Sequence, residues 1–235
     1  MRGTFVKAKR HVALLLVAVS AAGAPPAQAQ GAAWRPIERS EFCVTDGSIG
    51  RTADHMIIDG AQARATVRSA TSQFAELRFA YLGPSALTVP LGSGLERRQI
   101  GLKLHAQDSC NVVYAMWHIE ADERVAVAIK RNAGKHTHAE CGNRGYRIAA
   151  TSTQAMPLTI GSVHTLRAAL RSDVVEVYAD MALALTTKLE RRMLDFDGPV
   201  GMRTDNGRFR FQYFVGGPGS GPLSRPLDQN TNRCH

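Results

Sequence analysis

The sequence predicts a single all-β domain, and three observations carry this prediction. Apolar and polar residues alternate with a period of two from about residue 57 to residue 215. Turn-forming pairs such as Asp59-Gly60 and Asn206-Gly207 interrupt the alternation at short intervals, the latter as a predicted hairpin turn. Amphipathic helical patterns are almost absent. Many short strands joined by tight turns favour a β-sandwich or a barrel.

The strands are predicted where the alternation runs without a break. They cover residues 56–58, 63–68, 75–81, 99–107, 111–120, 125–130, 146–149, 164–170, 174–179, 200–204 and 209–215. Residues 188–194 contain Glu190-Arg191-Arg192 and predict no more than one helical turn.

The N-terminal segment has the features of a signal peptide. A basic start at residues 1–10 precedes an apolar run at residues 12–19 that is too short to span a bilayer. Ala27-Gln28-Ala29 supplies the small-x-small pattern of a cleavage site, so we expect the mature chain to begin at Gln30. This predicts a secreted or periplasmic protein with no membrane span after cleavage. An uncleaved N-terminal anchor is the alternative.

Three segments follow from these patterns. Residues 1–29 are the expected signal peptide, residues 30–215 the β-sandwich domain, and residues 216–235 a tail rich in Gly and Pro without an apolar pattern.

The charge balance disfavours nucleic-acid binding. The chain has 29 Lys and Arg against 20 Asp and Glu, a formal charge of +9. Four of these cations and no acid precede residue 30, so the mature chain keeps 25 of the 29 cations against all 20 acids. Because cations and acids are interspersed and no dense basic stripe occurs, we expect no nucleic-acid partner.

Export changes the interpretation of the four cysteines. An even number in an oxidising compartment predicts disulfides, and four cysteines allow three connectivities. We favour Cys110 with Cys141, because they bracket one block of strands, and Cys43 with Cys234, because they lie near the two ends of the mature chain. A zinc site would need close pairs such as C-x-x-C, which are missing.

The C-terminal part of the predicted domain resembles a known family. Residues 164–180 read HTLRAALRSDVVEVYAD, residues 198–206 read GPVGMRTDN, and residues 209–211 read FRF. This pattern resembles the last strands of concanavalin A-like lectin/glucanase domains, the jelly-roll sandwich that includes laminin-G-like modules. The resemblance implies a two-sheet antiparallel jelly roll with a hairpin between residues 164–170 and 174–179. Met181 stands where many relatives have Gly, which indicates an altered turn.

The resemblance implies a fold and leaves the function open. Lectins, carbohydrate-binding modules, glycoside hydrolases, polysaccharide lyases and adhesion domains share this sandwich. Glucanases of the fold carry E-x-D-x-x-E on one strand. The nearest sequence here, Glu120-Ala121-Asp122-Glu123, has another spacing and lies at a predicted turn. We therefore do not expect retaining hydrolysis by that arrangement.

Alternation also predicts which side chains would face a ligand. If the more apolar side of each strand points inward, the other side carries polar residues. If these strands form the concave sheet, one groove holds Arg78, Lys103, His105, Gln107, Tyr114, His118 and Lys130. Such a positive groove favours a carbohydrate ligand, and an acidic polysaccharide in particular. The polar outer face of an ordinary sandwich is the alternative.

Four residues of this set would also suit a lyase. Jelly-roll polysaccharide lyases remove the proton alpha to a uronate carboxylate, with His or Tyr as base or acid and Arg, Gln or Asn neutralising the carboxylate. If the protein is an enzyme, we expect His105, His118, Tyr114 and Arg78 to be catalytic. The sequence motifs of those lyases are missing.

His136, His138 and Glu140 form a candidate metal site. In an extended segment the two histidines share a face, and one further ligand, such as His118, would complete a zinc or copper site. Lys135 beside them would repel a cation. A hydrogen-bonded loop that closes against a disulfide explains the same residues. We therefore expect no cofactor, with a metal at this loop as the alternative.

Three functions from different classes remain. The first is a secreted glycan-binding or cell-envelope interaction module without a catalytic signature. The second is a lyase or hydrolase that acts on an acidic glycan through a His/Tyr/Arg groove, and the third is a structural or adhesion domain. Aromatic residues, at 6%, are few for a carbohydrate binder, and they leave Tyr81, Tyr114 and Tyr146 as stacking platforms.

Overall fold

The computed structural model describes Gly3 and residues 34–68, 73–120 and 122–216. The chain divides into two units, Met1–Gln30 and Gly31–His235, and the described strands all belong to the second. The predicted signal peptide, except Gly3, and the predicted tail from residue 217 onward lie outside the described residues. Within the described part, no helix is long and apolar enough to cross a membrane.

The described chain consists almost entirely of strands, as the alternation predicted. In order along the chain, the elements are β1 (Trp34–Ile37), η1 (Arg39–Glu41), β2 (Phe42–Gly47), β3 (Gly50–Arg51), β4 (Met56–Ile58), β5 (Gln62–Val67), β6 (Phe74–Pro84), β7 (Gln99–Leu104), β8 (Val112–His118), β9 (Val125–Lys130), α1 (His138–Cys141), β10 (Tyr146–Thr151), β11 (Val163–Arg171), β12 (Val174–Ala179), β13 (Ala182–Lys188), η2 (Arg191–Met193), β14 (Gly201–Asp205) and β15 (Gly207–Gly216). The helical turn predicted near residue 190 is the 3₁₀ turn η2.

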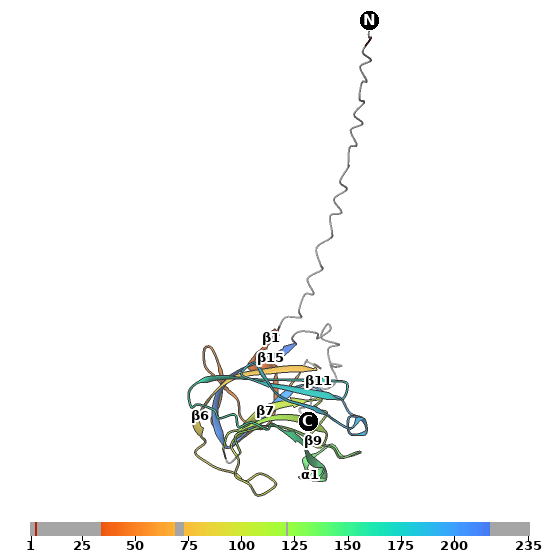
Figure 1. Cartoon of the computed structure of the whole chain (residues 1–235). Helices are drawn as coiled ribbons and strands as arrows, with labels where there is room; N and C mark the ends of the chain where they lie inside the picture. Colours follow the sequence, from red (N-terminus) through yellow and green to blue (C-terminus); the bar gives the residue numbers. More distant parts are fainter. Residues whose placement is uncertain (1–2, 4–33, 69–72, 121, 217–235) are drawn as a thin grey trace. The chain divides into compact units, whose positions relative to one another are not determined.

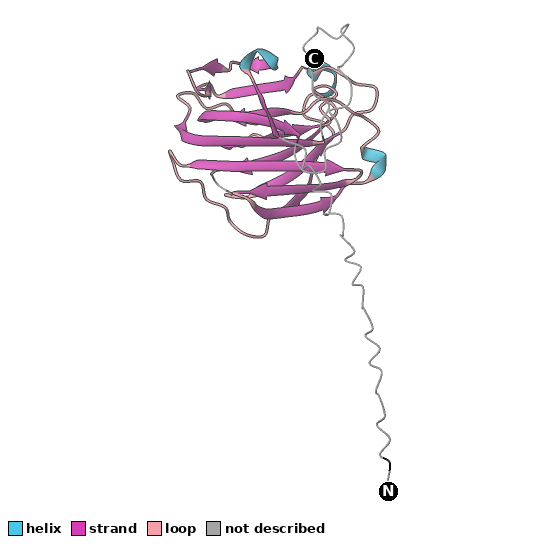
Figure 2. Ribbon diagram, turned by 90° about the horizontal axis from the view of Figure 1, so that it is seen from above, coloured by secondary structure: helices cyan, strands magenta, loops and turns pink. Residues whose placement is uncertain are grey.

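The strands pair into two antiparallel sheets that stack as two layers (Figure 1). The eight-stranded sheet has the order β13-β12-β11-β6-β15-β4-β3, with β1 added beside β15. The seven-stranded sheet has the order β10-β9-β8-β7-β14-β5-β2. Strands of each layer run side by side when viewed from above (Figure 2). The two-sheet antiparallel sandwich is therefore confirmed.

The core lies between the sheets and follows the period of two. Leu102 and Leu104 of β7 are fully buried against Val113 and Ala115 of β8 and against the other layer. The indole of Trp117 meets the ring of Phe79 edge to face at 5.9 Å, a favoured aromatic geometry that ties the two sheets together. Side chains at the intervening positions of β7 and β8 point out of the sandwich.

The strands at the ends of the chain were not all predicted. β1, β2, β3 and β13 were missed because each is short or carries mixed polar residues. β1 pairs with the last residues of β15, so that Trp34 lies opposite Gly216. The two ends of the described sandwich therefore meet at one place in the eight-stranded sheet.

The hairpin implied by the family resemblance is present. β11 pairs with β12 in the register that places Leu166 opposite Ala179. β12 then turns into β13 through Asp180 and Met181, whose φ angles are +47° and +69°. Two consecutive residues with positive φ are typical of a type I′ turn, which normally favours Gly or Asn. The turn is thus tight in spite of Met181.

The predicted hairpin turn at Asn206-Gly207 is wrong. β14 belongs to the seven-stranded sheet and β15 to the eight-stranded sheet, so this segment crosses between the layers. The side chain of Asn206 accepts a hydrogen bond from the Val89 amide (2.8 Å) and donates to the carbonyl oxygens of Val89 (2.9 Å) and Arg97 (3.1 Å). Asn206 therefore fastens the long β6–β7 connection to the crossover.

Gly101 in β7 provides a test of how closely the strands of the seven-stranded sheet approach. A Cβ atom at this position would lie closer than 3.0 Å to the Ala115 carbonyl oxygen and to Met116 Sδ. We expect Gly101→Ala to lower the free energy of unfolding by about 1–3 kcal/mol in urea denaturation, because the strands cannot separate without cost. Gly50→Ala is the matched control, since its Cβ would meet only an ordinary contact at 3.8 Å. Equal stability of both variants would contradict this account.

Candidate functional site

The outer face of the seven-stranded sheet carries the most unusual group of side chains in the described structure. Since Leu102 and Leu104 point into the core, Lys103 between them points outward. The register places Lys103 between Tyr114 of β8 and Gly201 of β14. We call this group the charged face and define it as Arg64, Gln99, Lys103, Tyr114, Arg203 and Asp205.

Asp205 organises the charged face. Its side chain is fully buried and accepts hydrogen bonds from Arg64 Nη2 (2.8 Å), Gln99 Nε2 (2.7 Å) and Arg203 Nε (2.7 Å). Arg64 also pairs with Asp46 at 3.2 Å, at the edge of the sheet. Two guanidinium groups therefore share one buried carboxylate, and charge-assisted hydrogen bonds of this kind hold both in fixed positions.

Arg203 reaches across β7 toward the tyrosines. Its backbone partner is Gly101, which has no side chain to block the way, and its guanidinium lies 5.4 Å from the centre of the Tyr114 ring. The Tyr114 ring in turn lies 6.0 Å from the ring of Tyr146 on β10. Burial alone would lower the pKa of Arg203, but the carboxylate of Asp205 raises it above its ordinary value. Arg203 is therefore a permanent cation.

Lys103 is the one member of this face without a partner among the described residues. Its side chain makes no hydrogen bond or ion pair there, although the residue is only 8% exposed. Burial, followed by the charges of Arg64 and Arg203, lowers the pKa of Lys103 to about 7, against the opposing effect of Asp46 and Asp205. A strongly shifted pKa at a specific charge cluster is a mark of functional sites.

The structure brings together part of the predicted groove. Lys103, Tyr114, His118 and Lys130 all lie on the outer face of the seven-stranded sheet. Lys130 has a structural role, because its ammonium group donates hydrogen bonds to the carbonyl oxygens of Ser109 (2.9 Å) and Gly142 (2.6 Å).

His118 sits at the far end of this face. Burial, followed by the charge of Arg97, lowers the pKa of His118 to about 4, so its ring is neutral at physiological pH. Its Nδ1 lies 3.8 Å from the Asp122 carboxylate, beyond hydrogen-bond distance, and its Nε2 lies 3.3 Å from Arg97 Nη1.

The remaining predicted groove residues lie elsewhere. Arg78 belongs to β6 of the eight-stranded sheet, where it donates to Glu76 at 2.7 Å and covers the Phe214 ring at 4.2 Å. The prediction that Arg78 shares a groove with Lys103 is therefore wrong. Alternation predicts which side of a strand a residue faces, but it does not predict the sheet to which the strand belongs. His105 and Gln107 follow the end of β7, which stops at Leu104 because His105 has a φ of +45°.

The four candidate catalytic side chains do not converge. Gln99 at the start of β7 pairs with His118, whereas His105 follows the other end of the strand. Six residues at about 3.3 Å each separate the two ends by roughly 20 Å along the strand. Tyr114 lies between them, and Arg78 lies on the other layer. The nearby carboxylates are paired, Glu120 with Arg98 and Asp122 with Arg124.

Of the three tyrosines considered as stacking platforms, one is exposed. Tyr81 is 2% exposed in the core and Tyr114 is 6% exposed, so neither offers a ring face to a sugar. Tyr146 is 43% exposed and is the more exposed member of its tilted ring pair with Tyr114.

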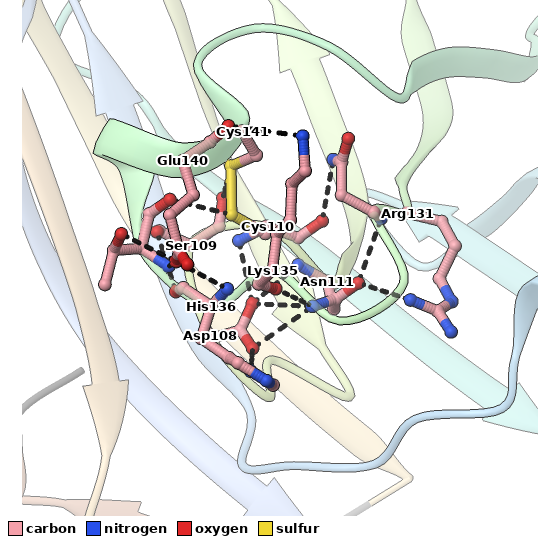
Figure 3. A network of polar contacts seen from close by, with 11 residues as sticks. Asp108, Ser109, Cys110, Asn111, Arg131, Lys135, His136, Glu140 and Cys141 are labelled. Carbon is pink, nitrogen blue, oxygen red and sulfur yellow. Dashed lines mark hydrogen bonds and ion pairs between the residues drawn. A yellow bond between two sulfur atoms is a disulfide. The ribbon is translucent and has the colours of Figure 1, made fainter.

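The loop proposed as a metal site forms a hydrogen-bonded network (Figure 3). Asp108 accepts hydrogen bonds from the amides of Cys110 and Asn111, both at 2.8 Å, and lies 2.8 Å from His136 Nδ1. Asn111 then accepts from Arg131 Nη1 at 2.8 Å. These contacts join the β7–β8 loop to the β9–β10 connection.

The predicted metal geometry is wrong for this loop. His138 begins the short helix α1, so it does not share an extended face with His136. Glu140 forms a capping box with Thr137 and also accepts from the His136 amide, and these hydrogen bonds lower the pKa of Glu140 to about 2. Among the described residues, no group of three His, Cys, Asp or Glu side chains is arranged to hold a metal ion.

The disulfide between Cys110 and Cys141 is present as predicted, and it closes the same network. Both cysteines are fully buried. Cys43 is not a free thiol, and its predicted partner Cys234 lies outside the described residues.

Two hollows of the described surface are lined by residues outside the charged face. One of about 170 Å³ lies where β1 and β4 meet beside β15 and is lined in part by Glu38, Arg51 and His55. Another of about 430 Å³ lies at the β8–β9 connection and is lined by Glu120, Asp122, Glu123, Arg124 and Ala155. Lys103 lines neither of them.

Arg64, Gln99, Arg203 and Asp205 were not among the predicted site residues. The signal was available in part, because the alternation of residues 200–204 places Arg203 on the side opposite Met202. Nothing local indicated that Arg64, at a separation of 141 residues, would share the carboxylate of Asp205.

Comparison with solved structures finds proteins that share the two-layer antiparallel sandwich. The carbohydrate-binding module CBM66 from Bacillus subtilis has a TM-score of 0.52 and 14% identity, over 73% of this chain and 91% of that chain. The laminarinase from Rhodothermus marinus has a TM-score of 0.51 and 11% identity, over 79% and 93%. The carbohydrate recognition domain of Emp46p has a TM-score of 0.50 and 13% identity, over 75% and 88%.

The fold is therefore the concanavalin A-like sandwich, which carbohydrate-binding modules and glycoside hydrolases share. No protein-family model matches the chain, and no curated protein sequence matches it. At these identities the likeness establishes the fold alone, and the function has to be argued from the charged face.

The disulfide should be a major source of stability. Cys110 and Cys141 are separated by 31 residues, and a cross-link of this length restricts the unfolded chain. We expect the double variant Cys110→Ser, Cys141→Ser to lose about 2–4 kcal/mol of unfolding free energy in guanidinium titration. A variant as stable as the parent under oxidising conditions would show that the hydrogen-bond network holds the loop alone.

Lys103 should destabilise the folded protein. Below pH 7 both the folded and the unfolded chain carry its charge, so the folded chain bears the full cost of burial. Between pH 7 and its ordinary pKa of 10.5 the folded chain has lost the proton that the unfolded chain retains, and the cost shrinks. We expect Lys103→Met to raise the unfolding free energy by about 1–4 kcal/mol at pH 6 and by less at pH 9. A loss of stability at pH 6 would mean that a partner neutralises the ammonium group.

Proposed function

We propose that this protein is a secreted glycan-binding module that holds a saccharide on the charged face of its seven-stranded sheet. The observation that carries the proposal is the composition of this face. An ordinary sandwich exposes solvated polar residues on its outer side. Here the outer side contains a buried lysine, two arginines that share a carboxylate, and two tyrosine rings in tilted contact.

Tyr146 supports a saccharide ligand in particular. Sugar rings present a face of C–H groups that packs on aromatic rings, and Tyr146 exposes 43% of its surface beside the buried Tyr114. The hydroxyl groups around such a ring would meet the hydrogen-bond donors of Arg203 and Lys103. A platform with donors at its rim suits a carbohydrate better than an apolar ligand.

The positions of the acid and base candidates favour binding over lyase chemistry. A lyase needs a base, an acid and a carboxylate-neutralising group around one sugar. His105 and His118 lie at opposite ends of β7, and Arg78 lies on the other sheet. His118 is also a weak base, because burial and Arg97 keep its pKa at about 4.

Secretion is part of the same proposal. It is supported by the basic, apolar and small-x-small pattern of residues 1–29 and by the Cys110–Cys141 disulfide, which is stable in an oxidising compartment. Cell fractionation with an antibody to the sandwich, together with N-terminal sequencing of the mature chain, would test the export and the cleavage after Ala29.

Binding to an array of neutral and acidic polysaccharides, followed by titration calorimetry of the ligands found, tests the glycan-binding role. We expect Tyr146→Ala to weaken binding roughly tenfold, because it removes the stacking platform. Tyr178→Ala on β12 is the matched control, since Tyr178 lies on the outer face of the other sheet. If Tyr178→Ala weakens binding and Tyr146→Ala does not, the ligand lies on the other face. If no polysaccharide binds, the protein is a structural domain.

A further inference from the structure

The two buried lysines of the seven-stranded sheet have opposite surroundings. Lys130 is 6% exposed, and carbonyl oxygens at 2.9 Å and 2.6 Å accept hydrogen bonds from its ammonium group. Lys103 is 8% exposed, and no described residue accepts a hydrogen bond from it. The fold therefore provides hydrogen-bond acceptors for Lys130 and none among the described residues for Lys103.

The groups around Lys103 explain why no acceptor remains. The charged groups that act on it are Arg64 from β5, Arg203 and Asp205 from β14, and Asp46 from β2. Tyr114 of β8 lies directly opposite it across the strand pair. Asp205 Oδ1 and Oδ2 are already occupied.

The occupants of these oxygens are the partners of Asp205 itself. Arg64 and Arg203 donate to Oδ1, at 2.8 Å and 3.4 Å, and Gln99 and Arg203 donate to Oδ2, both at 2.7 Å. Asp46 pairs with Arg64. Each described carboxylate near Lys103 is thus taken by an arginine.

A largely buried ammonium group without a counter-charge is unfavourable, because it keeps only part of its hydration and gains no acceptor from the described residues in return. Methionine or leucine at this position of β7 would pack on the same neighbours without that cost. Functional sites are the places where proteins keep such groups, and the missing acceptor is then supplied by the ligand.

We propose that Lys103, flanked by Arg64 and Arg203, is the seat for a single anionic oxygen group carried by the bound glycan, either the carboxylate of a uronic acid or a sulfate ester. This inference rests on the proposed glycan-binding function and specifies its ligand. The small exposed area of Lys103 admits such a group but not a sugar ring, so the ring stays on Tyr146 while its charged substituent reaches inward. The two arginines are fixed by Asp205 and add positive potential without moving.

Binding to this seat is coupled to a proton. Because the pKa of Lys103 is lowered to about 7, free Lys103 is partly deprotonated at pH 7 and more so at pH 8. An anion on Lys103 favours its charged form, so complex formation takes up a proton at neutral and higher pH. Affinity for an acidic glycan should fall roughly tenfold from pH 6 to pH 8, whereas affinity for a neutral glycan should not change.

The test compares ligands that differ in charge alone. Oligogalacturonate and its fully methyl-esterified form share one backbone, and a sulfated polysaccharide with its desulfated form provides the second pair. Titration calorimetry of the whole mature chain against each ligand, at pH 6 and pH 8, measures affinity. Repeating the titrations in two buffers of different ionisation enthalpy measures proton uptake.

The variants are Lys103→Met and the control Lys188→Met. Lys188 lies on β13 of the other sheet, its side chain is 73% exposed, and its substitution makes the same change of residue type as Lys103→Met. We expect Lys103→Met to weaken binding of the acidic ligand at least tenfold and to abolish the pH dependence. Lys188→Met should change the affinity less than twofold.

The outcomes separate this inference from the proposed function. Preference for the carboxylated or the sulfated ligand, lost in Lys103→Met, supports the seat and identifies which anion it takes. Equal binding of charged and neutral ligands, or an acidic ligand held as tightly by Lys103→Met, overturns the seat and leaves the glycan-binding role intact. Failure of every glycan to bind overturns both.

Discussion

The buried carboxylate of Asp205 is the interaction on which the outer face of the seven-stranded sheet depends. It lies at the end of β14 and draws donors from β5, from β7 and from its own strand, so that one side chain links three neighbouring strands. A carboxylate removed from water needs hydrogen-bond donors in place of water, and here Arg64, Gln99 and Arg203 provide them. Their positions are consequently fixed by the requirements of Asp205, and this leaves the face with more positive than negative charge.

Two glycines, Gly101 and Gly201, also shape the charged face. Gly101 lies opposite Arg203 and Gly201 lies opposite Lys103, so neither charged residue faces a side chain at these two paired positions. Backbone from the adjacent strands approaches both glycines too closely for a Cβ atom. The missing side chain of Gly101 therefore has two effects. It lets the neighbouring strands pack closely, and it lets the Arg203 side chain reach Tyr114. Stability of the sheet and geometry of the charged face are coupled through these two residues.

The fold was largely predictable because burial acts on each strand separately. Inward side chains such as Leu102, Leu104 and Trp117 recur at every second position, and this pattern is local. The assignment of strands to sheets is not local. Arg78 and Lys103 both point outward, yet they lie on opposite layers, and Asn206 connects the layers instead of closing a hairpin.

The site was predictable in part for the same reason. Lys103, Tyr114 and His118 were placed on one face correctly, because β7 and β8 are neighbours in sequence and in space. Arg64 contributes through a contact with Asp205, which is 141 residues away in the sequence. The alternation of polar and apolar residues is a local pattern and cannot predict such a contact. The metal site was expected from two histidines in an extended segment. The capping box between Thr137 and Glu140 formed a helical turn there instead, since a helix start satisfies backbone amides that an extended loop would leave open.

The pairing of β1 with the end of β15 has a consequence for how this sandwich can be combined with other proteins. Trp34 and Gly216 are partners across a strand pair, so the two ends of the described sandwich are separated by about 5 Å. A domain with adjoining ends can be inserted into a surface loop of a host protein without stretching it, or circularly permuted through a short linker. Both ends belong to the eight-stranded sheet, whereas the charged face belongs to the seven-stranded one. A fusion made at Trp34 or Gly216 would therefore start from the layer opposite the charged face and leave that face uncovered.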